Sequence, residues 1–219
     1  AGGGWYGRVN SGRFAAASVT VTAHRTLVSR LLSDGVEDGL GLLAQLDARP
    51  GGRSDTRLDR VADALAGSLA GPSALPVRYE RDGPRRALPD PVAALVGRGP
   101  GATPSGDDVL LGAMLVLLSV DDEAIARRSR FLSDAVGSLA ADETTTVSAA
   151  FLAQATRRRA ASPTLEFLRT ILRPGADAAD LSVAADAVLD VGHTSGADTL
   201  AGMLMATTAV LPTVAERRG

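Results

Sequence analysis

The segment that most constrains the fold runs from Gly97 to Gly112 and reads Gly-Arg-Gly-Pro-Gly-Ala-Thr-Pro-Ser-Gly-Asp-Asp-Val-Leu-Leu-Gly. Its glycines and prolines, up to Pro104, oppose a helix, because glycine is conformationally free and proline has a fixed φ and no N–H. From Ser105 onward an apolar run follows without a helix breaker. We therefore expect a loop that delivers N–H groups, a hydroxyl and two carboxylates to the start of a buried helix.

A second segment repeats this helix start. Ser105–Gly112 and Ser195–Gly202 both read Ser-Gly-x-Asp-x-Leu-x-Gly, and each follows closely on a threonine, Thr103 or Thr194. Both open an apolar segment rich in Leu, Met and Ala. The similarity is too short and too isolated to indicate a solenoid, whose units recur at a fixed period of tens of residues.

Composition limits the classes of protein and site. The chain has 219 residues, 45% hydrophobic and only 3% aromatic, so we expect a single domain over residues 1–219 with small side chains between closely packed helices. A net charge of −2 gives no reason to expect nucleic acid or an anionic membrane as a partner. The absence of cysteine and the presence of only two histidines exclude thiolate chemistry and a Cys- or His-rich metal centre.

No leader pattern is visible at the start of the given sequence, and the apolar runs at 109–118 and 199–211 are shorter than the roughly 20 residues that span a bilayer. We expect a soluble, cytoplasmic protein without a membrane segment.

The predicted fold class is α+β and predominantly α-helical. Residues 1–89 form a small mixed N-terminal part in this prediction, with strands at 18–22 and 75–79 and helices at 27–32, 40–46 and 56–70. Residues 90–219 form a helical bundle with two buried helices opened by the Ser-Gly-x-Asp motifs. Its predicted helices lie at 91–96, 105–119, from 121, 147–155, 165–172, 181–191 and 195–211.

The motifs have two interpretations. The simpler is helix capping, since each fits the Ser-x-x-acid pattern of a capping box, while Gly112 and Gly202 let two helices cross closely. A cap requires neither the preceding glycine loop nor the adjacent pair Asp107 and Asp108, which point about 100° apart on a helix. These extra features favour a ligand site.

In the second interpretation the two helix starts meet in one cleft. Helix N–H groups would hold a small anion, and Asp107 and Asp108 would hold Mg²⁺. His193 is either a general acid/base or part of the turn. The candidate catalytic residues are Asp107, Asp108, His193 and Asp198. The candidate substrate-binding residues are Arg98, Gly99, Gly101, Thr103, Ser105, Gly106, Thr194, Ser195 and Gly196.

The segments Gly99–Asp108 and Gly192–Asp198 resemble a bacterial family that includes the AllH-type subunit of oxamate carbamoyltransferase, over about residues 90–210. Its members accompany FdrA-like proteins in allantoin and purine catabolism. The resemblance implies transfer of a carbamoyl group between an oxamate-type compound and phosphate, giving carbamoyl phosphate, in a complex with FdrA-like subunits or in a homo-oligomer. The small anionic substrate would then sit at the paired helix starts.

Two other functions stay open from the sequence. One is a non-catalytic scaffold or ligand-sensing subunit of an FdrA-like complex. The other is a Mg-dependent phosphotransferase, against which the absence of any lysine counts, because a Walker motif needs one.

Overall fold

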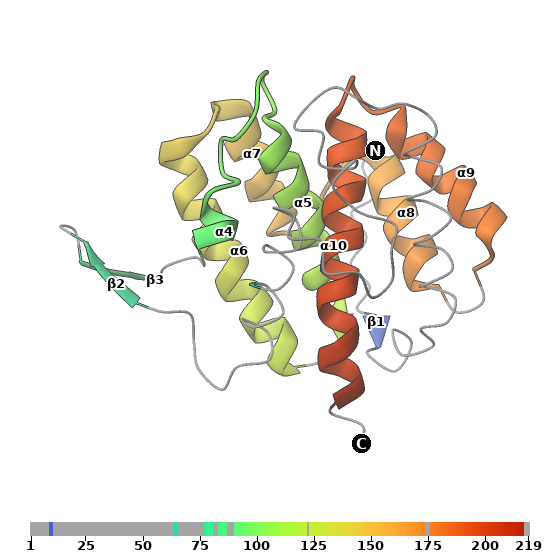
Figure 1. Ribbon diagram of the computed structural model, residues 1–219, viewed down its shortest axis with the longest axis horizontal. Helices are drawn as coiled ribbons and strands as arrows, with labels where there is room; N and C mark the ends of the chain where they lie inside the picture. The colour runs from blue at the N-terminus through green and yellow to red at the C-terminus, as the bar shows by residue number, and fades with distance from the viewer. Residues whose placement is uncertain are drawn as a thin grey trace.

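The computed structural model describes residues 9–10, 64, 77–80, 83–86, 90–121, 123–173 and 176–216. This part of the chain is predominantly α-helical (Figure 1). From residue 90 onward its helices are α4 (Asp90–Ala93), α5 (Ser105–Leu117), α6 (Glu123–Glu143), α7 (Thr146–Ala155), α8 (Ser162–Leu172), α9 (Ala178–Leu189) and α10 (Ser195–Glu216).

The strands are short. β1 (Val9–Asn10) pairs in parallel with β4 (Val120–Asp121). β2 (Val77–Glu80) and β3 (Gly83–Arg86) form an antiparallel hairpin that projects from the helices in Figure 1. Most of residues 1–89 lies outside the described residues, including the strand predicted at 18–22, the helices predicted at 27–32 and 40–46, and, apart from Ala64, the one at 56–70. The mixed N-terminal part therefore stays a prediction.

Helices α5 and α10 form the central pair. They lie side by side in Figure 1, with α6 and α7 on one side and α8 and α9 on the other. Every residue of α5 except Leu111 is buried, and α10 is buried from Gly196 to Thr207. A helix enclosed on all faces is apolar around its whole circumference, as both of these are.

Two glycines set the distance between the central helices. A Cβ atom added to Gly112 would lie 2.1 Å from the carbonyl oxygen of Thr199, and one added to Gly202 would lie 1.9 Å from that of Val109. Any side chain at either position would force the helices apart. The predicted close crossing is thus confirmed, and the two contacts occupy equivalent places in the two motifs.

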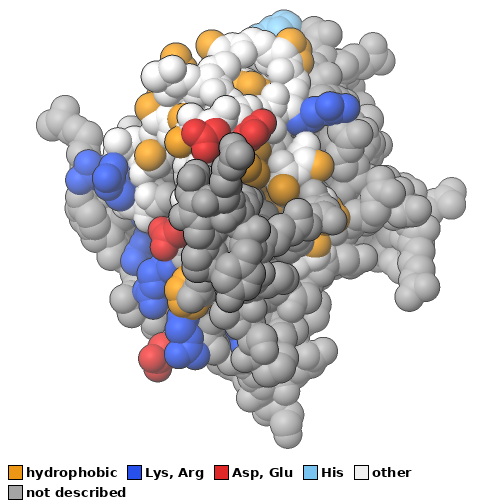
Figure 2. Space-filling model, turned by 90° about the vertical axis from the view of Figure 1, so that its left-hand side faces the viewer, with side chains coloured by type: hydrophobic (Ala, Val, Ile, Leu, Met, Phe, Trp, Pro, Cys, Tyr) orange, Lys and Arg blue, Asp and Glu red, His pale blue; other side chains and the backbone are white. Residues whose placement is uncertain are grey.

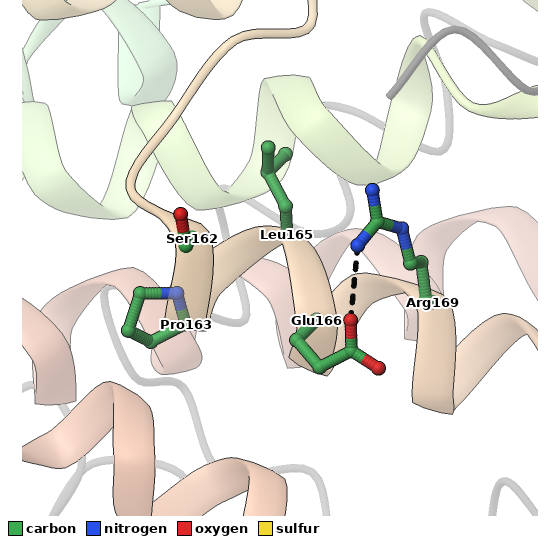
Figure 3. A pocket seen from close by; sticks show the side chains of 5 residues that line it. All are labelled: Ser162, Pro163, Leu165, Glu166 and Arg169. Carbon is green, nitrogen blue, oxygen red and sulfur yellow. Dashed lines mark hydrogen bonds and ion pairs between the residues drawn. The ribbon is translucent and has the colours of Figure 1, made fainter. Parts of the chain in front are cut away.

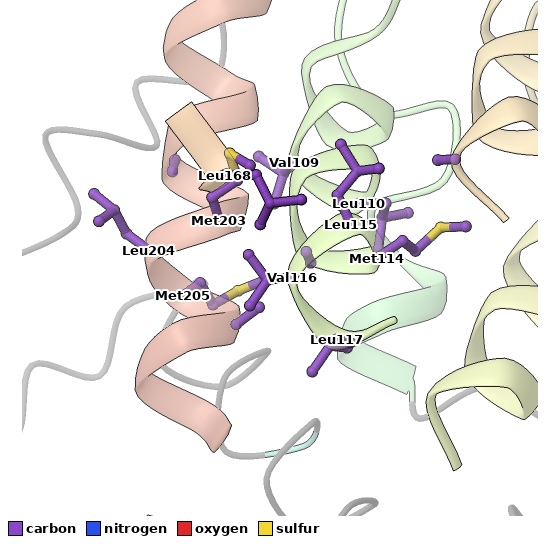
Figure 4. Packing of buried hydrophobic residues seen from close by; sticks show 14 of the residues in the cluster. Val109, Leu110, Met114, Leu115, Val116, Leu117, Leu168, Met203, Leu204 and Met205 are labelled. Atoms are coloured by element: carbon purple, nitrogen blue, oxygen red, sulfur yellow. The ribbon is translucent and has the colours of Figure 1, made fainter. Parts of the chain in front are cut away.

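Branched and flexible aliphatic side chains fill the core around this crossing. Figure 4 shows Val109 of α5 beside Met203 of α10 and Leu168 of α8, with Leu110 and Met114 on the opposite side of α5. Phe167 is the one aromatic residue among the largest fully buried side chains of the described part. Burying a side chain of this size contributes about 1.5–3 kcal/mol, so the small-residue core is still a substantial source of stability.

Four helix ends differ from the prediction. Helix α5 ends two residues early, at Leu117, and α10 extends to Glu216. The helix expected at 91–96 ends at Ala93, and a series of turns leads to Gly97, whose φ is +66°. Helix α7 ends at Ala155 as predicted, and the arginines at 157–159 lie in the turn after it. Helix α9 ends at Leu189, two residues before its predicted end. No helix in the described ranges is both long and apolar enough to cross a bilayer.

Candidate functional site

The N-terminal ends of α5 and α10 lie together, at the same end of the central pair. The hydroxyl groups of Thr103, in the loop before α5, and Ser195, the first residue of α10, are 2.9 Å apart. The structure therefore brings the two Ser-Gly-x-Asp motifs, 90 residues apart in the sequence, into contact.

The acids and hydroxyls of the motifs pair across the two helices. Asp108 of α5 accepts a hydrogen bond from Ser195 of α10 and another from Thr103. Asp198 of α10 accepts one from Ser105 of α5. Each aspartate is thus paired with the serine of the opposite helix, and the two pairs are related by an approximate twofold axis between the helices.

Both acids are buried and incompletely satisfied. Asp108 is 5% exposed and Asp198 is 3% exposed. In each, the Oδ2 atom has no hydrogen-bond partner within the described structure. Buried polar atoms are nearly always paired, so two unpaired oxygens in equivalent positions make this junction the candidate site.

The environment shifts both carboxyl groups towards the protonated form. Burial raises the pKa of Asp108 to about 7, and the nearby Asp198 adds to this shift. Hydrogen bonds from Ser195 and Thr103 oppose it. Burial likewise raises the pKa of Asp198 to about 6 against the hydrogen bond from Ser105. A charged carboxylate loses its hydration on burial, which is the physical cause in both cases.

Asp107 faces a different element. Its carboxylate accepts hydrogen bonds from the backbone N–H of Gly97 (2.8 Å), the hydroxyl of Ser148 (2.7 Å) and the hydroxyl of Thr144. These donors belong to the turn after α4 and to the start of α7, so Asp107 fastens α5 to both. The charge of Asp107 adds slightly to the raised pKa of Asp108.

The carboxyl groups of Asp107 and Asp108, which we predicted to share Mg²⁺, have different hydrogen-bond partners. Asp107 and Asp108 diverge, the first towards α7 and the second towards α10. Among the residues that the structure describes, no group of three or more His, Cys, Asp or Glu side chains is placed to hold a metal ion.

Several N–H groups of the motifs are used within the loops. Gly106 donates to the carbonyl of Arg98 (2.8 Å), and Gly196 donates to that of Val191 (3.0 Å). The N–H groups of Asp107 and Asp108 both donate to the carbonyl of Pro104. These four N–H groups are therefore engaged within the protein, whereas we expected N–H groups of the motifs to hold an anion.

The second residue of each motif, Gly106 or Gly196, must be glycine because the backbone of another segment lies too close for a side chain. A Cβ on Gly106 would lie 2.0 Å from the carbonyl oxygen of Leu95, and one on Gly196 would lie 2.0 Å from that of Val188. In each half the helix start packs directly on the helix or turn that precedes it.

The other predicted site residues lie in the two loops. Arg98, Gly101 and His193 are exposed. Gly99 has a φ of +118° and packs against Ser105, and the carbonyl of Thr194 accepts a hydrogen bond from the N–H of Asp198. The side chain of Thr103, in the loop before α5, hydrogen-bonds to Ser195 and to Asp108.

The capping interpretation is wrong for α5. The N-cap residue is Pro104, no side chain caps the helix, and Ser105 is already the first helical residue. Its hydroxyl therefore reaches across to Asp198 instead of back to its own helix.

Two residues of this region escaped the sequence-based prediction, namely Thr144 and Ser148, which hold Asp107. The run of three threonines at 144–146 could have predicted the start of α7 in the sequence, because threonine is a common N-cap residue. In the structure Thr145 is the N-cap of α7 and accepts a hydrogen bond from the N–H of Ser148 (3.1 Å).

A surface pocket of about 350 Å³ lies elsewhere, on α8 (Figure 3). Glu166 and Arg169 form an ion pair of 2.9 Å on its wall. The pocket is lined by Ser162, Pro163, Leu165, Glu166 and Arg169 and contains no residue of either motif.

A family model described as oxamate carbamoyltransferase subunit AllH matches residues 95–207. The match covers just over half of the chain and contains both motifs. The chain belongs to this family. The AllH match begins within the turns after α4 and extends into α10, so it includes the crossed acid–serine pairs and the anchor of Asp107 on α7. No solved structure matches the chain.

Proposed function

We propose that this chain is a subunit of an oxamate-carbamoyltransferase-like enzyme and binds a small substrate of the carbamoyl phosphate or oxamate type at the starts of α5 and α10. The substrate would contact Asp108 and Asp198, with Ser105, Ser195 and Thr103 holding these acids in position. The reaction would break the bond between a carbamoyl carbon and nitrogen, form a bond from that carbon to a phosphate oxygen, and return a proton to the nitrogen.

The observation that carries the proposal is the pair of buried acid oxygens without partners at the junction of the two motifs. Membership of the AllH family supplies the class of substrate. Carboxyl groups with a pKa near neutrality also suit the proton transfer that carbamoyl transfer requires, because a catalytic acid or base works best near the ambient pH. Arg98 and His193, exposed in the flanking loops, are candidates for contacts with the anionic part of the substrate.

A thermal-shift titration of the purified chain tests this proposal. Carbamoyl phosphate, oxamate, phosphate and ATP would each be added with and without Mg²⁺. A ligand that binds only the folded state raises the melting temperature by mass action. We expect carbamoyl phosphate or oxamate to do so, and the shift to be lost in Asp198→Ala but kept in Asp134→Ala, which changes an exposed acid on α6.

A shift with ATP and Mg²⁺ alone would favour a phosphotransferase. No shift with any compound would contradict the proposal and favour a subunit that acts as a scaffold.

A further inference from the structure

We infer that Asp108 and Asp198 together form a clamp for a primary amide, with one N–H of the amide donated to each carboxyl group. This inference rests on the proposed function and names the end of the substrate that the site holds. It differs from the sequence-based expectation, in which the paired helix starts hold the anionic end.

Several hydrogen-bond donors of the two motifs are already in use within the protein. The hydroxyls of Ser105 and Ser195 are committed to the aspartates of the opposite helices. The N–H groups of Gly106 and Gly196 are committed to loop carbonyls. Among the side-chain atoms of the two motifs, acceptors without donors are left over, namely the two Oδ2 atoms. A ligand that hydrogen-bonds to these two atoms must therefore bring donors.

The two acids are arranged symmetrically between the central helices. The central helices meet through equivalent contacts, Gly112 on Thr199 and Gly202 on Val109, so the two acids stand on either side of an approximate twofold axis. A planar –NH₂ group carries two N–H donors related by a twofold axis along its C–N bond. Placed on the axis of the protein, it offers one donor to each acid.

The charge of the two carboxyl groups also favours a neutral ligand over an anion. A carboxylate or phosphate placed between the acids would bring only acceptors, and it would meet two carboxyl groups of its own sign whenever these are ionised. A neutral amide end avoids this repulsion, whereas an anionic end does not. Figure 2 shows the mixed surface of one face of the molecule, with acidic side chains near its centre and basic ones at the left, the lower left and the upper right.

Oxamate and pyruvate form a matched pair of probes, because they have the same charge and nearly the same shape and differ by –NH₂ in place of –CH₃. Calorimetric titration of the full chain at pH 8 compares their affinities. We expect oxamate to bind at least about tenfold more tightly than pyruvate, since a hydrogen bond to a charged group has an effect of this size. In Asp108→Ala and Asp198→Ala the preference should fall to about twofold or less, and in Asp134→Ala it should persist.

The outcomes separate the clamp from the proposed function. Equal binding of oxamate and pyruvate by the unaltered chain would overturn the clamp and leave a carboxylate-binding site in place. A preference for oxamate that survives both alanine variants would also overturn it. Binding of neither probe would contradict the proposed function itself, and the clamp with it. The comparison on the unaltered chain needs no variant, so a folding defect in one of them does not affect it.

Discussion

The two halves of the site, α4–loop–α5 and α9–loop–α10, are built alike. Each loop contains a glycine with positive φ, Gly99 at +118° and Gly192 at +68°, that packs against the first serine of the next helix. Each helix then places a glycine on a carbonyl of the preceding segment and another on the opposite central helix. The halves therefore share the features that dock a helix start and present one acid.

The motifs differ at three positions, and at one of these only the first half has an acid, Asp107 against Ala197 in the second. Asp107 is bound by three donors, two of them from the start of α7, whereas Ala197 is buried among apolar neighbours. The acid that occurs in only one half thus serves local structure. The acids that occur in both halves, Asp108 and Asp198, face each other, and these are the two with unpaired oxygens.

The contact shared by the halves is the most sensitive point. Gly112→Ala would place a Cβ 2.1 Å from the carbonyl of Thr199, and we expect it to destabilise the fold by about 3 kcal/mol or more, because the central helices must separate. Urea unfolding measures the loss.

Gly137→Ala is the matched control, since a Cβ there meets nothing within 4 Å on helix α6. It should stabilise the protein by about 0.5–1 kcal/mol through helix propensity. Equal effects of the two substitutions would contradict the close crossing.

Asp107→Ala removes the acid that only the first half of the site has. It would leave the Gly97 N–H and two hydroxyls without their acceptor, and we expect a loss of about 2–3 kcal/mol in unfolding free energy. Asp108→Ala removes an acid that is already short of partners, so its effect at pH 8 should be smaller or even stabilising. Chemical denaturation of both variants at pH 8 checks the order, and the reverse order would refute the division of roles.

The acids also make stability depend on pH. The folded state raises the pKa of Asp108 from 3.8 to about 7, so the folded protein holds this proton more tightly than the unfolded chain does. The stability from this group is fully present below about pH 3.8 and is lost as the pH rises through about 7. Between pH 5 and pH 8, Asp108→Asn should therefore gain about 2 kcal/mol relative to the unaltered protein. Melting temperatures across this range would show it, and a constant difference would contradict it.

The smallest expected effects test the hydrogen bond from each serine to the acid of the opposite helix. Ser195→Ala should raise the pKa of Asp108, and Ser105→Ala should raise that of Asp198, because each serine donates to the acid of the opposite helix. Each change should cost about 1 kcal/mol in stability. Carbon-13 titration of the two carboxyl groups measures both shifts. A shift in the acid of the same helix would mean that the serines act as caps.

Local chemistry made parts of this structure predictable. Proline and glycine before Ser105 leave few places where α5 can begin, and the small residues at 112 and 202 indicated a close crossing. The predicted ends of α4, α5 and α9 were less accurate, and the end of α4 depends on turns that include the positive φ of Gly97. The N-terminal part had no comparable signal beyond short alternating runs, and most of it lies outside the described residues.

The sequence by itself determined that two similar helix starts exist and that each carries a serine and, three positions along, an acid. Only the tertiary structure decided that Ser105 serves Asp198 and that Ser195 serves Asp108. The same holds for the separation of Asp107 from Asp108. Spacing within a helix fixes only the direction in which a side chain points, whereas its partner depends on which distant segment docks on that face. Here that segment lies 90 residues away, and two glycines allow it to come close.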